Sequence, residues 1–147
     1  MVQQTVTKSG ESANITTSAV NFATSAGWFF DLPETGERAD TQPMLSSGVV
    51  IINANIPNKI DACNPGGISW QYWVDYATGG RVQGAASAGG RRGTIISTRP
   101  VVIEAKGIKI VTRGGDATTS TTSLPVRPTG SAGRRVSWRE LTDTQDP

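Results

Sequence analysis

Acidic residues crowd one short stretch of the chain, "DLPETGERAD" at positions 31 to 40. The four carboxylates belong to Asp31, Glu34, Glu37 and Asp40. Closely spaced carboxylates serve as general acids and bases, or as oxygen ligands for calcium. A calcium loop alternates acidic residues with single spacers, whereas Leu32-Pro33 and Thr35-Gly36 separate the acids here. The spacing therefore favours a solvated turn between two strands over a metal site.

Other catalytic chemistry lacks its usual residues. The sequence contains no histidine, which removes His-based triads and His-ligated zinc. Its one cysteine, Cys63, has no partner for an internal disulfide and no histidine to generate a thiolate. We therefore predict that Cys63 is structural and that the chain is not an enzyme.

Basic residues gather in the second half of the chain. Residues 1–80 hold three Lys/Arg against seven Asp/Glu, and residues 81–147 hold eleven against five. Such a half can attract an anionic surface electrostatically. Within it, "GGRRG" at 89–93 lacks the Lys-Ser/Thr ending and the following helix of a phosphate-binding loop. No nucleic-acid-binding signature appears, so we expect no nucleic-acid partner and interpret Arg91, Arg92 and Trp73 as possible surface contacts.

These residues must be positioned by strands rather than helices. With 17 glycines, 8 prolines and 36% hydrophobic residues, the chain favours short antiparallel strands and many turns. No window of helical length keeps a 3.6-residue apolar period. The clearest strand is "ISWQYWVDY" at 68–76, which places one alternating set on the core face: Trp70, Tyr72, Val74 and Tyr76. Trp73 lies on the other face, covered by a neighbouring layer or open to a ligand.

Further strands are predicted at 3–8, 26–32, 48–57 and 134–141. Two or three more are predicted within 93–113, with breaks at Pro100 and at 105–107, and "ATGG" at 77–80 is predicted as a hairpin turn. Loops are predicted at 53–67, at 84–93 and at 114–133, the last with a flexible composition. The longest apolar run, Val49–Ile52, is far too short to span a membrane. The chain is thus predicted to be a single all-β domain over residues 1–147.

Two long segments carry a resemblance to a known family. "GWFFDLPETGERADTQPMLSSGVVIINANIP" and "DACNPGGISWQYWVDYATGGRV" resemble the carboxy-terminal region of the PilY/PilC proteins of bacterial type IV pili. Residues 27–81 match well, 134–141 match modestly, and 82–133 match only in character. The motif positions to which we assign a structural role are Trp28, Asp31, Gly36, Glu37, Arg38, Cys63, Gly66, Gly67 and Trp70.

The resemblance implies part of a modified β-propeller, with about two blades in this C-terminal fragment. It also implies export, a pilus-tip or outer-membrane location, and roles in pilus biogenesis and surface or host attachment. The implied partners are the rest of a parent protein, minor pilins of the pilus tip, and a host or abiotic surface. Family members bind calcium through an acidic loop resembling D-x-D-x-N-x-D. That loop is not found here, so no cofactor is carried over.

Alternatives remain open for both fold and function. The fold alternative is a small independent β-sandwich or barrel. One functional alternative is a fragment of a quinoprotein-like propeller enzyme. Another is a carbohydrate-binding β module that stacks sugars on Trp28, Trp73 or Trp138. For the acidic stretch, we predict that Glu37 and Arg38 tie the turn together by hydrogen bonds and charge pairing.

Overall fold

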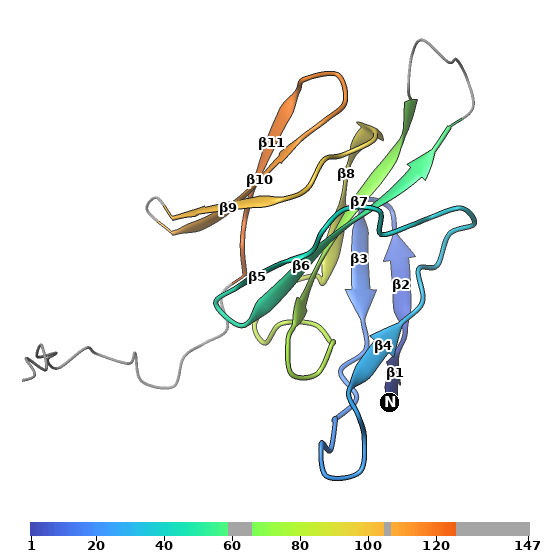
Figure 1. The fold of residues 1–147 in the computed structure, drawn as a ribbon, viewed down its shortest axis with the longest axis vertical. Coiled ribbons are helices and arrows are strands. Elements are labelled where there is room, and N and C mark those ends of the chain that lie inside the picture. The colour runs from blue at the N-terminus through green and yellow to red at the C-terminus, as the bar shows by residue number, and fades with distance from the viewer. Residues whose placement is uncertain (59–65, 105–106, 126–147) are drawn as a thin grey trace, which may run out of the picture.

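The fold was obtained as a computed structural model that describes residues 1–58, 66–104 and 107–125 (Figure 1). Those residues form eleven strands and no helix, which confirms the all-β prediction. The strands are arranged in sheets of six, three and two strands. None of these sheets closes on itself, so the described residues exclude the barrel alternative.

The six-stranded sheet has the order β2-β3-β8-β7-β6-β5, and every neighbouring pair is antiparallel. Its last four strands follow one another as a meander, and the hairpin of β2 and β3 extends the sheet beyond β8. The bounds are β2 (Val6–Ser9), β3 (Ser12–Ile15), β5 (Met44–Ser46), β6 (Val49–Pro57), β7 (Gly66–Asp75) and β8 (Gly89–Ile95).

A smaller antiparallel sheet of three strands lies against one face of the large sheet (Figure 1). It consists of β9 (Val101–Glu104), β10 (Ile108–Arg113) and β11 (Thr119–Ser123), with β10 in the middle. The remaining pair, β1 (Val2–Gln4) and β4 (Trp28–Phe30), is parallel. This pair is an exception to the predicted antiparallel pattern.

Apolar residues form one cluster on each face of β7. On one face, Trp70, Tyr72 and Val74 pack with residues of β2, β3 and β6, and Trp28 and Phe30 of β4 lie against them. On the other face, Trp73 packs with Val49, Ile51, Val82, Ile110 and Leu124, so this cluster joins the two sheets. Strand β7 is therefore internal to the fold on both sides.

The alternation predicted for β7 is confirmed up to Val74 but is wrong for Tyr76. Trp70 is 3% exposed, and Tyr72 and Val74 are fully buried, whereas Tyr76 is 52% exposed. The strand ends at Asp75, whose Oδ1 accepts hydrogen bonds from the backbone N–H groups of Ala77 and Thr78. The side chain of Asp75 thus starts a turn, and the period of two stops before Tyr76.

All three predicted loops contain strand residues. In the loop predicted at 53–67, residues 53–57 belong to β6 and residues 66–67 belong to β7. Residues 89–93, assigned to a loop, are the first part of β8, which pairs with β3 and β7. Thr119–Ser123, inside the predicted flexible loop, form β11 and pair with β10. The predicted strand at 134–141, with Trp138, and the cysteine Cys63 lie outside the described residues.

Candidate functional site

The acidic stretch folds as a turn that sends one carboxylate inward. The Glu37 side chain has no exposed surface. Its Oε1 accepts a hydrogen bond from the Tyr72 hydroxyl at 2.6 Å, and its Oε2 lies 2.9 Å from Lys8 Nζ. Lys8 Nζ also contacts Glu34 Oε1 at 2.8 Å. The turn is thereby tied to both β2 and β7, which supply Lys8 and Tyr72.

Aromatic rings enclose this ion cluster, which we define as Lys8, Glu34, Glu37 and Tyr72. Lys8 Nζ lies 4.0 Å from the centroid of the Trp70 ring, a distance at which the ring face attracts the ammonium group. Burial, followed by the hydrogen bond from its hydroxyl to Glu37, raises the pKa of Tyr72 well above its ordinary value of 10.0. The tyrosine is therefore a fixed hydrogen-bond donor.

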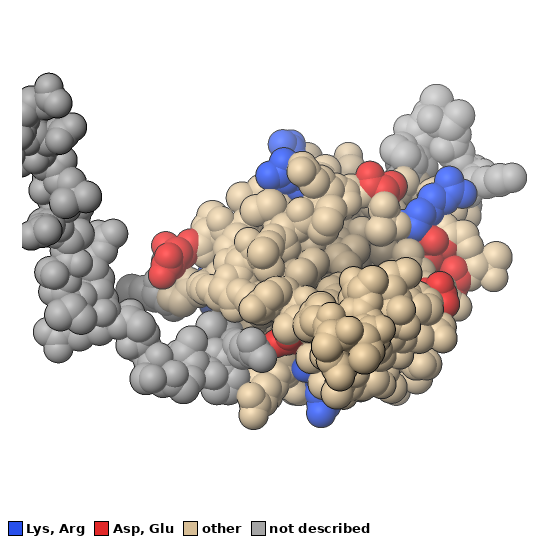
Figure 2. Space-filling model, turned by 60° about the horizontal axis from the view of Figure 1, so that its bottom comes forward, with Lys and Arg blue, Asp and Glu red and all other residues tan. Residues whose placement is uncertain are grey.

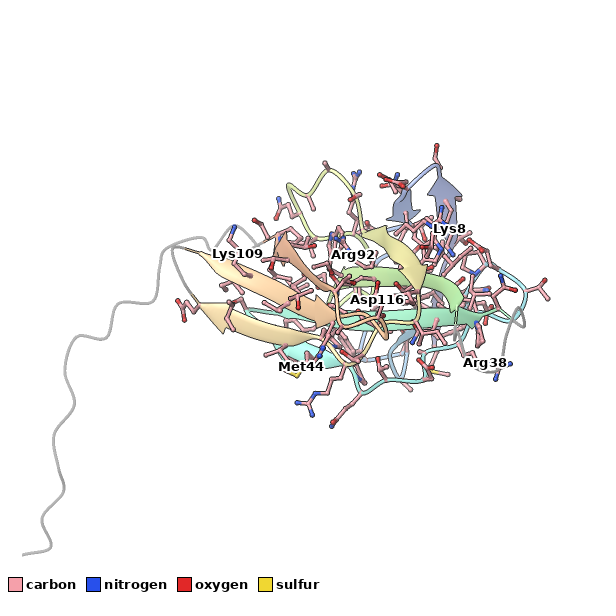
Figure 3. All side chains as sticks on the ribbon, turned by 90° about the horizontal axis from the view of Figure 1, so that it is seen from above. Lys8, Arg38, Met44, Arg92, Lys109 and Asp116 are labelled. Carbon is pink, nitrogen blue, oxygen red and sulfur yellow. The ribbon has the colours of Figure 1, made fainter. Side chains whose placement is uncertain are left out.

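Arg38 has a different role from the one predicted. Its backbone N–H donates to Asn55 O at 3.0 Å, and its carbonyl accepts from Asn55 N at 2.8 Å. The Arg38 side chain is exposed and points away from the sheets (Figure 3). The hydrogen bonding predicted for this turn is present. The cation that pairs with Glu37 is Lys8, 29 positions away in the sequence, and not Arg38.

The other two acids of the stretch each meet an amide side chain. Asp31 Oδ2 accepts from Gln3 Nε2 at 3.1 Å, and Asp40 Oδ1 accepts from Asn55 Nδ2 at 2.7 Å. Across residues 1–58, 66–104 and 107–125, no three His, Cys, Asp or Glu side chains come together as a possible metal site.

Two glycines of the predicted motif stand where a side chain would collide or be strained. Gly67 lies so close to β6 that a Cβ would approach Ile56 O to 2.6 Å. Gly36 has a φ of 81°, in the left-handed region. A close contact of a third glycine, Gly79, was not predicted. Trp28 Nε1 donates a hydrogen bond to Tyr76 O at 2.9 Å, and a Cβ on Gly79 would meet the Trp28 ring at 2.2 Å.

Of the three predicted surface contacts, Trp73 and Arg92 lie together, whereas Arg91 pairs with Trp70 across β7 and β8. Trp73 is 7% exposed, and its Nε1 donates a hydrogen bond to Ser87 O, so its side chain is buried and does not form part of the surface. Arg92 covers the Trp73 ring at 5.2 Å from its centroid, and Arg91 and Arg92 are half-buried. Contact with a surface through the two arginines stays a prediction.

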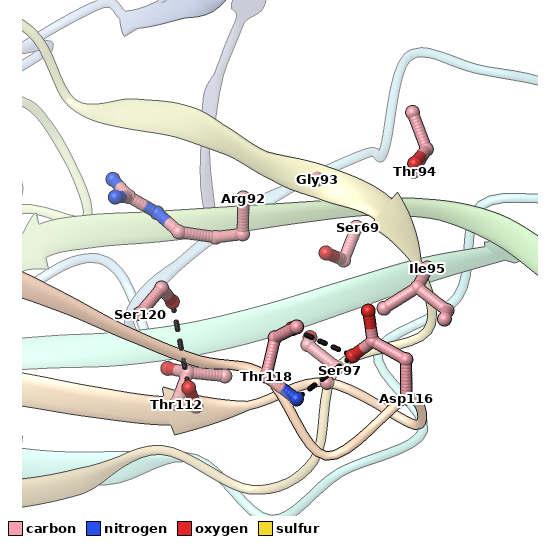
Figure 4. A pocket seen from close by; sticks show the side chains of 11 residues that line it. Ser69, Arg92, Gly93, Thr94, Ile95, Ser97, Thr112, Asp116, Thr118 and Ser120 are labelled. Atoms are coloured by element: carbon pink, nitrogen blue, oxygen red, sulfur yellow. Dashed lines mark hydrogen bonds between the residues drawn. The ribbon is translucent and has the colours of Figure 1, made fainter.

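Beside Arg92, a polar cleft of about 160 Å³ opens between β8 and the hairpin of β10 and β11 (Figure 4). Hydroxyl groups line it, and Arg92 and Asp116 stand at its opposite ends (Figure 4). Burial lowers the pKa of Arg92. Hydrogen bonds from Thr118 lower the pKa of Asp116. The cleft offers hydrogen-bond donors and acceptors together, which suits a polar side chain of a partner.

A second hollow is apolar and lies on another part of the molecule. It has a volume of about 370 Å³ and is lined by Trp28, Phe29, Phe30, Leu32, Ala39 and Ile52. Phe29 is 37% exposed there. Trp28, one of the three proposed sugar platforms, lines this hollow while also packing against the core.

On the face drawn in Figure 2, charged side chains do not form one continuous patch of one sign. Most blue and red groups are separated by uncharged residues, and several red groups lie next to a blue one at the right. Of the eleven Lys/Arg side chains in residues 81–147, four lie beyond residue 125, outside the described part. Among the described residues there is no helix that could span a membrane.

The fold and these sites define an all-β protein of two stacked sheets, with a buried ion cluster on one face and a polar cleft on the other. Over 75 residues the chain is 31% identical to a "Type IV pilus biogenesis factor PilY1 homolog" of Xylella fastidiosa (strain Temecula1 / ATCC 700964). The matched part covers 48% of this chain and 5% of that protein. No protein-family model matches the chain. No solved structure matches it.

Proposed function

We propose that this chain is a non-enzymatic module of a type IV pilus-associated protein and acts in pilus biogenesis and surface attachment. The observation that carries the proposal is the 31% identity to the pilus biogenesis factor. The absence of histidine from the sequence agrees with a non-catalytic role. The relative is far longer than the matched part, so the module acts within a larger protein.

The arrangement of the sheets supports the propeller part of the proposal. Strands β5 to β8 form a four-stranded antiparallel meander, which is the topology of a propeller blade. Strands β9 to β11 form a second meander that packs on the first through the apolar cluster around Trp73. Polar contacts also join the two: Gln71 Nε2 of β7 donates to Thr112 Oγ1 of β10 at 2.9 Å. We propose that the two meanders are consecutive blades.

The proposed location is the cell surface, at the pilus tip or on the outer membrane, after export. The proposed partners are the rest of the parent protein, minor pilins and the surface to which the bacterium attaches. For the attachment contact we propose Arg91 and Arg92, both half-buried. Arg92 carries the stronger case, because its guanidinium group is a donor that lines the polar cleft next to hydroxyl groups.

The test uses the bacterium that encodes the chain. We expect deletion of the coding region for residues 1–147 to remove pili from sheared surface fractions, as measured by immunoblot of the major pilin. We expect Arg92→Ala to keep surface pili and to reduce the number of attached cells severalfold.

Arg38→Ala is the matched control, because it removes an arginine whose exposed side chain lies away from Arg92 (Figure 3). It should leave both pili and attachment unchanged. Normal pili after the deletion would refute the biogenesis role. Equal attachment by the Arg92 and Arg38 variants would refute the contact.

A further inference from the structure

Within the ion cluster, an amine and a carboxyl carbon lie together in a site that is mostly closed to water. Lys8 Nζ lies 2.9 Å from Glu37 Oε2, so the carboxyl carbon bonded to that oxygen is close to attacking distance. The Lys8 side chain is 12% exposed and the Glu37 side chain is not exposed at all. We propose that Lys8 and Glu37 form an intramolecular amide cross-link with release of one water molecule.

The neighbouring groups are those that such a condensation needs. Glu34 Oε1 lies 2.8 Å from the same Nζ and can accept and return protons. The Tyr72 hydroxyl, 2.6 Å from Glu37 Oε1, donates a hydrogen bond to the atom on which negative charge develops during attack. The backbone N–H of Glu34 donates to Oε2, the departing oxygen, at 3.2 Å. Trp70 covers Nζ and keeps solvent away.

The atoms and charges balance without an oxidant or a co-reactant. Glu34 carries one ammonium proton from Lys8 to Glu37 Oε2, which leaves a neutral amine beside a neutral carboxyl group. The Nζ lone pair attacks Glu37 Cδ, and the C=O π pair moves to Oε1. Glu34 then takes a second proton from the nitrogen and delivers it to the Oε2 hydroxyl. That oxygen leaves as water, the C=O bond re-forms, and Glu34 ends as it began.

Glu37 rather than Glu34 is the acyl donor in this scheme. The Glu34 side chain is 40% exposed, so water can reach it, and it accepts no hydrogen bond from Tyr72. The ion pair is the resting state before the reaction, so the Lys8 ammonium group must first give up a proton before its nitrogen can attack. Cross-linking is therefore slow compared with folding. It would fix β2 covalently to the turn that precedes β5, and it does not depend on the proposed pilus role.

Intact-mass spectrometry of the purified, denatured chain tests the proposal directly. We expect the aged protein to be lighter than its sequence mass by one water molecule, and tandem spectra to place the loss in a branched peptide containing Lys8 and Glu37. Trypsin should also fail to cleave after Lys8. A mass equal to the sequence mass after prolonged incubation of the folded protein would overturn the proposal, as would a water loss located elsewhere.

Variants distinguish the roles of the cluster. Lys8→Arg retains a cation and should fold, as judged by circular dichroism, but should show no mass deficit. Glu37→Gln should lose ammonia instead of water, and continued loss of water from this variant would show that Glu37 is not the acyl donor. Glu34→Gln should slow the appearance of the lighter species about a hundredfold, as removal of a proton-transfer group does. An unchanged rate would refute that role.

Discussion

Replacement of the two tryptophans of β7 tests whether this strand is internal to two stacked sheets. Trp70 is 3% exposed on one face, and Trp73 is 7% exposed on the other. A tryptophan side chain buries about 150–250 Å². At about 25 cal/mol per Å² this area corresponds to about 4–6 kcal/mol. Truncation of a buried tryptophan to alanine measures about 3–5 kcal/mol. Both Trp70→Ala and Trp73→Ala should therefore lower the free energy of unfolding by about 3–5 kcal/mol.

The measurement is urea-induced unfolding followed by far-ultraviolet circular dichroism, because tryptophan fluorescence would itself change with the substitutions. Phe29→Ala is the control, since Phe29 is 37% exposed and should cost less than about 1 kcal/mol. If an alanine variant does not fold, Trp70→Phe and Trp73→Phe should still lose about 1–3 kcal/mol each. A Trp73→Ala variant as stable as Phe29→Ala would refute the stacking of β9–β11 on β7.

Three further predictions concern other contacts. In the same urea assay, Gly79→Ala should lower the free energy of unfolding by more than Gly10→Ala. Both glycines have a positive φ, but only a Cβ at Gly79 would also collide with Trp28. Equal losses of stability would contradict the contact between Gly79 and Trp28. Since the pKa of Tyr72 is raised on folding, its contribution to stability is complete below the unfolded value of 10.0 and is lost as the pH rises above it. Thermal melts of Tyr72→Phe should therefore fall less steeply above pH 10 than those of the unaltered chain, and parallel curves would argue against the shift. Calorimetry should find calcium binding weak or absent, and a dissociation constant near the roughly micromolar range of sensor proteins would show that the acidic stretch had been misinterpreted.

The sequence predicted the central strands well because their signal is local. Alternation of apolar residues identifies β7, and an uninterrupted apolar run identifies β6. The first part of β8 was missed because glycines are frequent there. The structure gives the reason for one of them: a Cβ on Gly89 would lie 2.8 Å from Gln71 O and 2.9 Å from the Tyr72 ring. Glycine here allows close strand approach, which composition alone does not distinguish from a loop.

Strand β11 was missed for a related reason. Its sequence, Thr119–Ser123, consists of serine and threonine and has no apolar side chain to reveal a period. Pairing with β10 makes it a strand, with Lys109 Nζ donating to Ser123 Oγ at the far end. The error at Tyr76 is also one of context, because the period of two was continued through a turn that the Asp75 side chain starts.

The acidic stretch shows most clearly where sequence reasoning ends. Its four carboxylates look equivalent in the sequence. In the fold, they differ in the distant residues that each of them contacts. Lys8, 29 positions before Glu37, and Tyr72, 35 positions after it, converge on this one carboxylate and leave no local trace in the sequence. An isolated carboxylate without exposed surface would be costly, so the ammonium group and the phenol are what allow Glu37 to be buried. The position of this cluster between β2 and β7 makes Glu37 the side chain that ties the turn to both of these strands.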